Sequence, residues 1–301
     1  MPLYKNLTDD QWQEKLAFFK ERYSPCGLCP RQCGVLRELD QSGVCHARKN
    51  VKIASSNLHY GEEPPISGER GSGTLFFSGC TLKCLFCQNY PISHLYNGIF
   101  YTIEQLSSLM LNLQERGAHN INLVSPTPYL YHFVHALYFA SQQGLTIPIV
   151  YNTSGYERVE IISGLSGLID IYMPDLKYLD QELSRRLSGR SDYFEYAYPA
   201  ILEMNDQVGE WVEDEDGIAE RGMVIRHLII PGQVENSKQV LKTIASSPFK
   251  HSHLSLMSQY FPAHKAPETP GIDRRLTHEE YAIVKDYAIA LGFDNGWFQD
   301  L

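Results

Sequence analysis

Three cysteines in one short segment are the residues of this 301-residue chain best suited to redox chemistry. Cys80, Cys84 and Cys87 lie in the sequence SGCTLKCLFCQNY, with the spacing C-x3-C-x2-C. A structural zinc site closes with four ligands, so three thiolates would need a distant fourth one. A [4Fe–4S] cluster held by three thiolates keeps one iron open for a substrate or cofactor. The spacing favours this open cluster over a zinc site or three unrelated core cysteines.

Four more cysteines precede this segment and form a second group of candidate metal ligands. They are Cys26, Cys29, Cys33 and Cys45, in a loop-like stretch that is too short to bury a core of its own. A bound metal would supply the folding energy that this stretch lacks. Zinc held by four sulfurs and an auxiliary iron–sulfur cluster both fit, and the spacing does not decide between them. A stretch without metal is the third alternative.

The elements that must position these cysteines alternate between strands and helices. From Thr74 onward, six apolar runs are separated by amphipathic stretches, as in a parallel sheet covered on both faces. The runs span residues 74–78, 121–125, 147–151, 168–173, 223–230 and 252–257. Six strand–helix units predict a (β/α)6 arrangement, open or barrel-like. The three-cysteine segment follows the first strand at its carboxyl end, where α/β barrels assemble their chemistry.

Further patterns predict helix starts and two regions of the chain. Capping pairs mark four expected helix starts, at Thr8–Gln11, Thr102–Gln105, Asn236–Gln239 and Thr277–Glu280. The Asp216-Gly217 pair predicts a hairpin before the fifth strand. We expect residues 1–70 to form an amino-terminal helix and a cysteine-rich metal-binding module. Residues 71–301 would then form the α/β barrel.

The three-cysteine segment, with Phe86 before its last cysteine, resembles that of the radical S-adenosylmethionine (SAM) enzymes. Longer stretches resemble the branch of pyruvate formate-lyase-activating enzyme. They are CGLCPRQCGVLR, FFSGCTLKCLFCQNYPIS, DIYMPDLKY, DGIAERGMVIRHLIIPG and MSQYFPAH. The resemblance implies a partial (β/α)6 TIM-like barrel of the radical SAM type. It also implies a [4Fe–4S] cluster on Cys80, Cys84 and Cys87, with SAM as the second cofactor.

The same resemblance implies a reaction. In this superfamily, the amino and carboxylate groups of SAM chelate the open iron, and the reduced cluster passes one electron to the sulfonium. The resulting 5′-deoxyadenosyl radical abstracts a hydrogen atom from the substrate. The branch implies a glycyl-radical enzyme as partner, and an electron donor such as flavodoxin or ferredoxin. Radical modification of another protein or small molecule is one alternative, and a non-catalytic iron–sulfur redox or interaction protein is another.

Two cofactor contacts are expected near the first two strands. By resemblance, Phe86 would lie near the adenine of SAM. Many radical SAM proteins carry a Gly-Gly-Glu motif after the second strand, and that motif is absent here. Ser125 stands at this point and can offer a hydroxyl and a backbone carbonyl to SAM.

The ends of the next three strands supply the remaining expected contacts. Asn152 and Thr153 lie where glycyl-radical activating enzymes have an Asp-Thr-Asn-Gly segment. Asn152 replaces the aspartate, so this chain lacks the carboxylate at that position. Asp175 and Lys177 match an Asp-Leu-Lys segment in which the lysine pairs with the SAM carboxylate. Arg226 lies inside the fifth strand beside a histidine. Because side chains alternate along a strand, only one of this pair can face the barrel interior.

Composition and charge argue against nucleic acid and membranes as partners. Acidic residues outnumber basic ones by 35 to 26, and the net charge of −9 argues against binding to nucleic acid. No apolar run approaches the roughly 18 residues of a membrane span. The first residues, MPLYKNLTDD, contain no apolar signal core. We therefore expect a cytoplasmic protein, whose cysteines serve metal or redox chemistry rather than disulfides.

Overall fold

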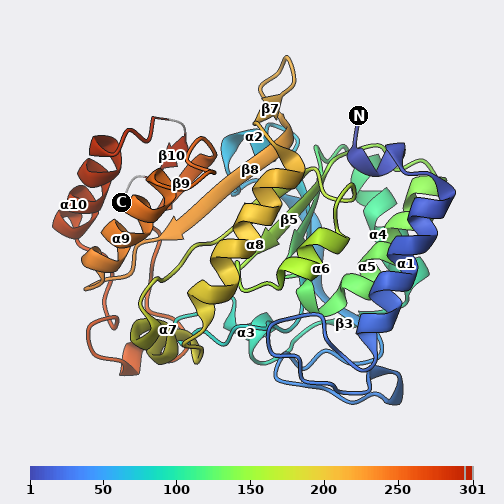
Figure 1. Cartoon of the computed structure of the whole chain (residues 1–301), viewed down its shortest axis with the longest axis horizontal. Coiled ribbons are helices and arrows are strands. Elements are labelled where there is room, and N and C mark those ends of the chain that lie inside the picture. Colours follow the sequence, from blue (N-terminus) through green and yellow to red (C-terminus); the bar gives the residue numbers. More distant parts are fainter. Residues whose placement is uncertain (295, 300–301) are drawn as a thin grey trace.

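A curved, largely parallel sheet forms the framework of the computed structural model, which describes residues 1–294 and 296–299 (Figure 1). Its six central strands are β2 (Ser72–Phe77), β4 (Ile121–Val124), β5 (Ile149–Thr153), β6 (Ile171–Pro174), β8 (Ala219–Leu228) and β9 (His253–Met257). Each is parallel to the next in that order. The prediction of six parallel strand–helix units is confirmed.

Three other strands extend this sheet and were not expected. They are β1 (Val51–His59), β3 (Ile99–Tyr101) and β10 (Gly296–Phe298), whereas β7 (Val212–Glu213) lies in a region where a hairpin was predicted. β1 pairs antiparallel with β2 and β3, whereas β10 pairs parallel with β9. β7 and β8 form the predicted hairpin. Within the described residues the outermost strands, β3 and β10, do not pair with each other, so the barrel is partial.

The division of the chain at residue 70 stays a prediction. Residues 51–59, on the amino-terminal side of that division, form β1 and share the sheet with the strands of the predicted barrel.

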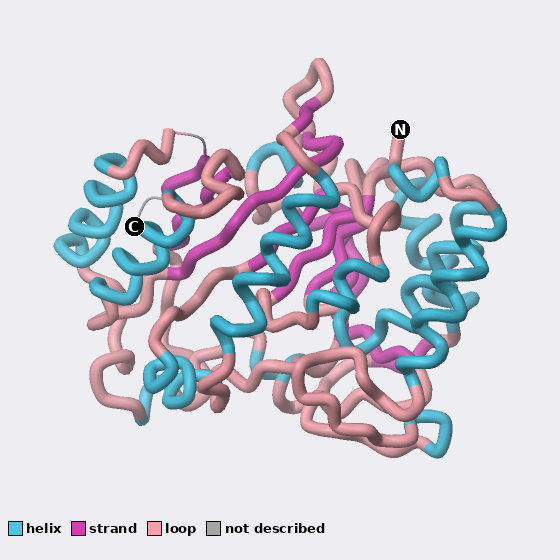
Figure 2. Tube along the Cα trace, in the orientation of Figure 1, coloured by secondary structure: helices cyan, strands magenta, loops and turns pink. Residues whose placement is uncertain are grey.

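Helices cover the outer face of the sheet, and the loops after the strands gather along the lower edge in Figure 2. The longer helices are α1 (Asp9–Tyr23), α4 (Ile103–Glu115), α5 (Leu130–Gln142), α7 (Gln181–Ser188), α8 (Tyr193–Val208), α9 (Val234–Ala245) and α10 (His278–Ala290). Shorter ones are α2 (Pro64–Ser67), α3 (Tyr90–Ser93) and α6 (Val159–Gly164). Within residues 1–294 and 296–299, no helix combines the length and apolar character needed to cross a bilayer.

Three of the four predicted helix starts are confirmed. Thr8, Thr102 and Thr277 each accept a hydrogen bond from the third residue of their helix, whose side chain bonds back in a capping box. The fourth is wrong, because α9 begins at Val234, two residues before Asn236. The Asn236 side chain instead donates to the Lys177 carbonyl at 2.9 Å, so it serves tertiary structure.

A short plug closes the barrel interior opposite its carboxyl end. α2 places Ile66, which is fully buried, against inward-facing residues of β5, β6 and β8. These residues are Val150, Ile171, Met173, Ala219 and Val224. The Ile66 carbonyl accepts a hydrogen bond from Asn120 at 2.8 Å, which fixes the plug to the residue before β4. The interior below the polar residues is therefore packed with side chains.

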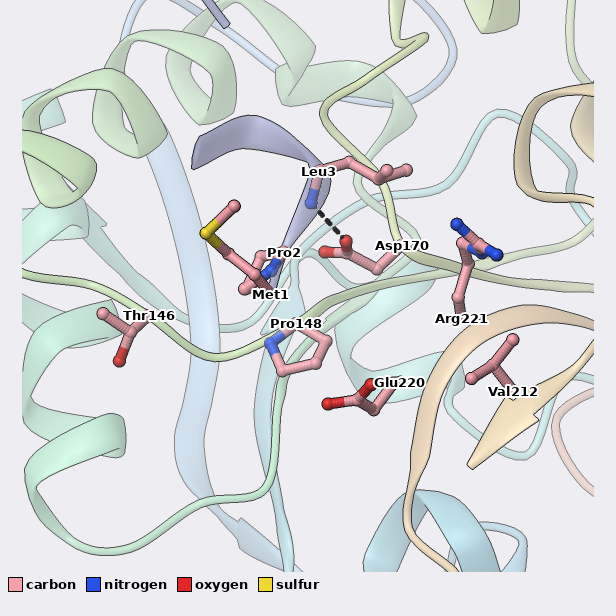
Figure 3. A pocket seen from close by; sticks show the side chains of 9 residues that line it. All are labelled: Met1, Pro2, Leu3, Thr146, Pro148, Asp170, Val212, Glu220 and Arg221. Carbon is pink, nitrogen blue, oxygen red and sulfur yellow. Dashed lines mark hydrogen bonds between the residues drawn. The ribbon is translucent and has the colours of Figure 1, made fainter. Parts of the chain in front are cut away.

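The amino terminus is attached near the start of β6 by one buried carboxylate (Figure 3). Asp170 accepts hydrogen bonds from the backbone N–H groups of Leu3, at 2.6 Å, and Ile149, at 2.8 Å. Burial raises the pKa of Asp170 to about 6, although the two backbone donors favour its charged form. Asp170 lines a pocket of about 270 Å³ at this end of the molecule.

Asp170→Asn is expected to change how stability depends on pH. Because the pKa of Asp170 is higher in the folded than in the unfolded chain, this carboxyl makes stability fall as pH rises from about 4 to about 6. The decline amounts to about 3 kcal/mol, which an amide at this position would not show. Chemical denaturation at pH 4 and pH 7 would measure it. If the wild type gained stability relative to the variant between pH 4 and pH 7, this assignment would be contradicted.

Candidate active site

The three-cysteine loop leaves β2 and lines a cavity at the carboxyl ends of the strands. Cys80, Cys84 and Cys87 all border this cavity of about 260 Å³. The loop is held from two sides, because the Leu85 N–H donates to the Leu187 carbonyl of α7 and the Leu85 carbonyl accepts from Lys265. Residues from β4, β5, β8 and β9 and from the segment after β6 complete the lining, so the loop faces the interior of the partial barrel.

The chemistry of the three thiols fits a cluster. Burial raises the pKa of Cys80 to about 12 and that of Cys84 to about 11, so metal ligation must supply the driving force for deprotonation. Among the described residues, no three His, Cys, Asp or Glu side chains converge as one metal ion requires. The three cysteines instead surround a shared cavity. That arrangement suits a cubane, whose irons each take a separate ligand.

Two cations and one carboxylate lie opposite this loop. Asp175 accepts hydrogen bonds from Lys177 Nζ, at 2.5 Å, and from Arg226 Nε, at 3.0 Å. Burial alone would raise the pKa of Asp175, but the two cations hold it below its usual value. Lys177 and Arg226 both border the cavity. The structure thus brings three predicted site residues together beside the three-cysteine loop.

Arg226 is also tied to residues on both sides of it. Its Nη2 donates to Asn152 Oδ1 at 2.7 Å, and its Nη1 lies 3.6 Å from Glu62 Oε2. The neighbouring His227 faces the opposite side of β8, where its ring meets the Leu176 carbonyl and Ser237. The expected alternation is therefore confirmed. Glu62 was not predicted, because its loop is far from Arg226 in the sequence and belongs to no recognisable pattern.

A second unpredicted carboxylate supports the end of β5. Glu157 is fully buried and accepts hydrogen bonds from the hydroxyls of Thr127, at 2.6 Å, and Thr153, at 2.5 Å. Burial raises the pKa of Glu157 to about 7. Thr153 and Asn152 border the cavity, as expected for SAM contacts. Glu157 thereby fixes the side chain of one cavity residue without reaching the cavity itself.

Phe86 and Ser125 also border the cavity. Phe86 is 5% exposed, and its ring centroid lies 6.0 Å from that of Tyr260. Ser125 has φ +57°, in the left-handed region that non-glycine residues rarely adopt. Its N–H donates to the Asn152 carbonyl at 2.9 Å, which ties the turn after β4 to β5. Strain of this kind persists where a surrounding structure imposes it, often at functional sites.

Ser125→Gly is expected to stabilise the fold while removing one cavity hydroxyl. Relief of the left-handed conformation is worth about 1–2 kcal/mol, and the greater freedom of glycine in the unfolded chain returns part of that. We expect a net gain of about 0.5–1 kcal/mol in the free energy of unfolding. Ser125→Ala is the matched control, because it removes the same hydroxyl but keeps the strain. Equal stabilities for the two variants in chemical denaturation would contradict the argument.

Three of the four amino-terminal cysteines lie near a buried cation. Cys26, Cys29 and Cys45 are buried, whereas Cys33 is exposed. Arg37 is 1% exposed, donates to the Pro128 carbonyl, and has its Nη2 3.7 Å from Cys45 Sγ. Burial would lower the pKa of Arg37, but the sulfur atoms of Cys45, Cys26 and Cys29, as thiolates, would raise it. No carboxylate of the described residues forms an ion pair with this guanidinium.

This cysteine-rich stretch packs directly on the three-cysteine loop. Arg31 Nε donates to the Thr81 carbonyl at 2.5 Å. Gly79 has φ +89°, and a Cβ there would lie 2.1 Å from the Cys45 carbonyl oxygen, so only glycine allows this approach. The two cysteine-containing loops are therefore neighbours in space, and both lie along the lower edge of Figure 1.

The fold is a partial α/β barrel, and its first parallel strand leads into a loop of three cysteines. This loop shares its cavity with Lys177 and the buried Asp175, so the site can hold a cluster and a charged cofactor. The sequence matches the Radical SAM superfamily over residues 74–244. The chain belongs to this superfamily, whose members use a [4Fe–4S] cluster and SAM. The pyruvate formate-lyase-activating branch does not emerge from these comparisons.

The chain is similar to two proteins of one archaeal species. It is 30% identical to the uncharacterized protein MJ0674 of Methanocaldococcus jannaschii, covering 93% of this chain and 79% of that one. Identity to MJ0808 of the same organism is 24%, over 78% and 68% of the two chains.

The similar solved structures are longer proteins of low identity. The solved structure described as native anSMEcpe with bound AdoMet and Cp18Cys peptide has a TM-score of 0.50 and 14% identity, over 71% of this chain and 56% of that one. Streptococcus suis SuiB bound to S-adenosylmethionine has a TM-score of 0.49 and 16% identity, over 74% and 48%. The chain thus spans about half the length of these structures, and the likeness to the first concerns the fold alone.

Proposed function

We propose that this protein cleaves SAM reductively at a [4Fe–4S] cluster held by Cys80, Cys84 and Cys87, and abstracts a hydrogen atom from a substrate. One observation carries the proposal: the three thiols share a cavity with Lys177 and with Asp175, its buried partner. When bound, the reduced cluster supplies the electron that breaks a carbon–sulfur bond of SAM. A glycyl-radical enzyme is the candidate substrate, supported by the sequence resemblance.

The residues of the chain bind and orient the cofactor. An ammonium group has three N–H donors, and Asp175 takes one of those of Lys177. The others can meet the carboxylate of SAM beside the open iron. Arg226 keeps Asp175 charged and in place, so Lys177 stays charged even though it is largely buried. Phe86 offers an apolar surface in the same cavity, which suits an adenine ring.

Anaerobic reconstitution with iron and sulfide, followed by reduction and addition of SAM, tests the proposal. Formation of 5′-deoxyadenosine and methionine is expected, with flavodoxin, ferredoxin or a chemical reductant as electron donor. Addition of a candidate glycyl-radical enzyme should then give the electron paramagnetic resonance (EPR) signal of a glycyl radical. Absence of 5′-deoxyadenosine despite a full, reducible cluster would favour the non-catalytic redox or interaction protein. Turnover of SAM without a glycyl radical would favour another substrate.

We also propose that Cys26, Cys29, Cys33 and Cys45 bind a second metal centre, either zinc or an auxiliary iron–sulfur cluster. No three of these side chains converge on one point in the described residues, so a single zinc ion would require the loop to close around it. Arg37 supports this proposal, because a buried guanidinium is costly unless an anion compensates it. Neutral thiols supply no such charge, and burial raises the pKa of Cys29 to about 12. Four thiolates bound to a metal would form a negative centre beside Arg37.

Metal analysis of the protein purified without oxygen tests the second centre. In a variant with these four cysteines changed to alanine, zinc or about four iron atoms per chain should be lost. Which element disappears identifies the centre. Metal content equal to that of the wild type would contradict the proposal.

A further inference from the structure

A buried hydroxyl pair contacts one of the proposed cluster ligands. Ser188, the last residue of α7, is fully buried, and its Oγ lies 3.0 Å from Cys84 Sγ. The same Oγ lies 2.9 Å from the hydroxyl of Tyr178, which is also fully buried. α7 is fixed to the cysteine loop by the Leu85–Leu187 backbone hydrogen bond, at 2.9 Å, so this contact is held in place.

Ligation of Cys84 to iron determines which atom donates in this chain of groups. A ligating cysteine is a thiolate and has no proton, so it can only accept a hydrogen bond. Ser188 must then direct its single proton to Cys84 Sγ. Tyr178 must in turn donate to Ser188 Oγ, which is left as an acceptor. The three groups form a one-way chain, from Tyr178 to Ser188 to Cys84.

The corresponding contact at Cys87 lacks this property. Ser93 Oγ lies 3.1 Å from Cys87 Sγ but also 2.8 Å from His94 Nδ1, which can accept the same proton. The Ser93 proton can therefore go either to sulfur or to His94. The Ser188 proton goes to sulfur, because Tyr178 can donate to Ser188 Oγ and does not need to accept from it. Of the two serines, Ser188 is thus the one whose proton is directed to a cysteine.

On the basis of the proposed function, we propose that Ser188 is a positioning residue that raises the reduction potential of the cluster, with Tyr178 orienting its hydroxyl. A reduced cluster carries one more negative charge than an oxidised one, and that charge is shared with the sulfur ligands. An O–H group pointing at Cys84 Sγ stabilises the reduced state more strongly. The cluster can therefore be reduced by a weaker reductant.

Ser188→Ala tests this inference in the full-length protein, reconstituted without oxygen. The midpoint potential is measured by EPR-monitored redox titration, on the signal that changes when SAM is added, because only an open iron binds SAM. We expect the reduction equilibrium to shift about tenfold toward the oxidised cluster, which is about 59 mV more negative for one electron. Tyr178→Phe should shift it in the same direction by less, since Ser188 then loses its orienting donor.

Ser184→Ala is the matched control. Ser184 lies on the same helix, is also buried, and donates to the Arg190 carbonyl at 2.5 Å rather than to a cysteine. Its variant should keep the wild-type potential. Unchanged potentials in both Ser188→Ala and Tyr178→Phe, with full iron content, would overturn the inference. If Ser188→Ala fails to assemble a cluster, Tyr178→Phe alone decides. A wild-type protein without any SAM-responsive signal would instead overturn the proposed function.

Discussion

Substituting alanine for Cys80, Cys84 and Cys87 together is expected to remove about four iron atoms per chain and to abolish SAM cleavage. All three thiols border one cavity, and no other cysteine borders it among the described residues. A cluster deprived of its three thiolates has no replacement ligands there. Iron analysis and a 5′-deoxyadenosine assay after anaerobic reconstitution provide the measurement.

A variant lacking only the amino-terminal cysteines is the matched control for this experiment. It should keep the SAM-responsive EPR signal, because Cys80, Cys84 and Cys87 are intact. If the triple variant retained all of its iron and continued to form 5′-deoxyadenosine, the cluster would have to be placed elsewhere.

Lys177→Ala is expected to weaken SAM binding by roughly 30-fold or more while iron content is maintained. The side chain is largely buried, so a carboxylate that loses this partner would lack both a counter-charge and full hydration. Removing one member of a desolvated charge pair costs about 2–5 kcal/mol, and 2 kcal/mol already corresponds to roughly 30-fold in affinity. Titration of the reconstituted protein with SAM would measure the change.

The fold should tolerate this substitution. Asp175 keeps its hydrogen bond from Arg226 Nε, at 3.0 Å, so no carboxylate is left without a cation. Lys242→Ala, on the exposed face of α9, is the control for loss of a positive charge and should bind SAM as the wild type does. Wild-type affinity in Lys177→Ala would show that the lysine serves Asp175 and not the cofactor.

Local patterns predicted much of the fold, where the controlling interactions were close in the sequence. The capping boxes at Thr8, Thr102 and Thr277 involve residues three positions apart, and all three are present. The start of α9 was missed because Asn236 contacts the loop after β6, 59 residues away in the chain. β1 and β10 were missed because their sequences are short or mixed, and pairing with β2 and β9 defines them as strands.

The candidate site divides in the same way. Cys80, Cys84 and Cys87 follow β2, and Asp175 and Lys177 follow β6. Parallel strands bring their carboxyl ends to one edge. Glu62 could not be assigned, since only the folded chain brings its loop to Arg226. Ser188 is an ordinary helix residue in sequence, and its contact with Cys84 spans 104 positions. Residues that touch the cavity were thus more predictable than residues that support them.

The plug formed by Ile66 has a consequence for the order of events. Because side chains of β5, β6 and β8 close the barrel beneath the polar residues, no molecule reaches the cavity through that end of the barrel. Whatever occupies the deeper position must enter before anything that covers it, and must leave after it. Where a macromolecular substrate covers the mouth, a small cofactor beneath it must bind first and its fragments must leave last, which is a compulsory-order kinetic mechanism.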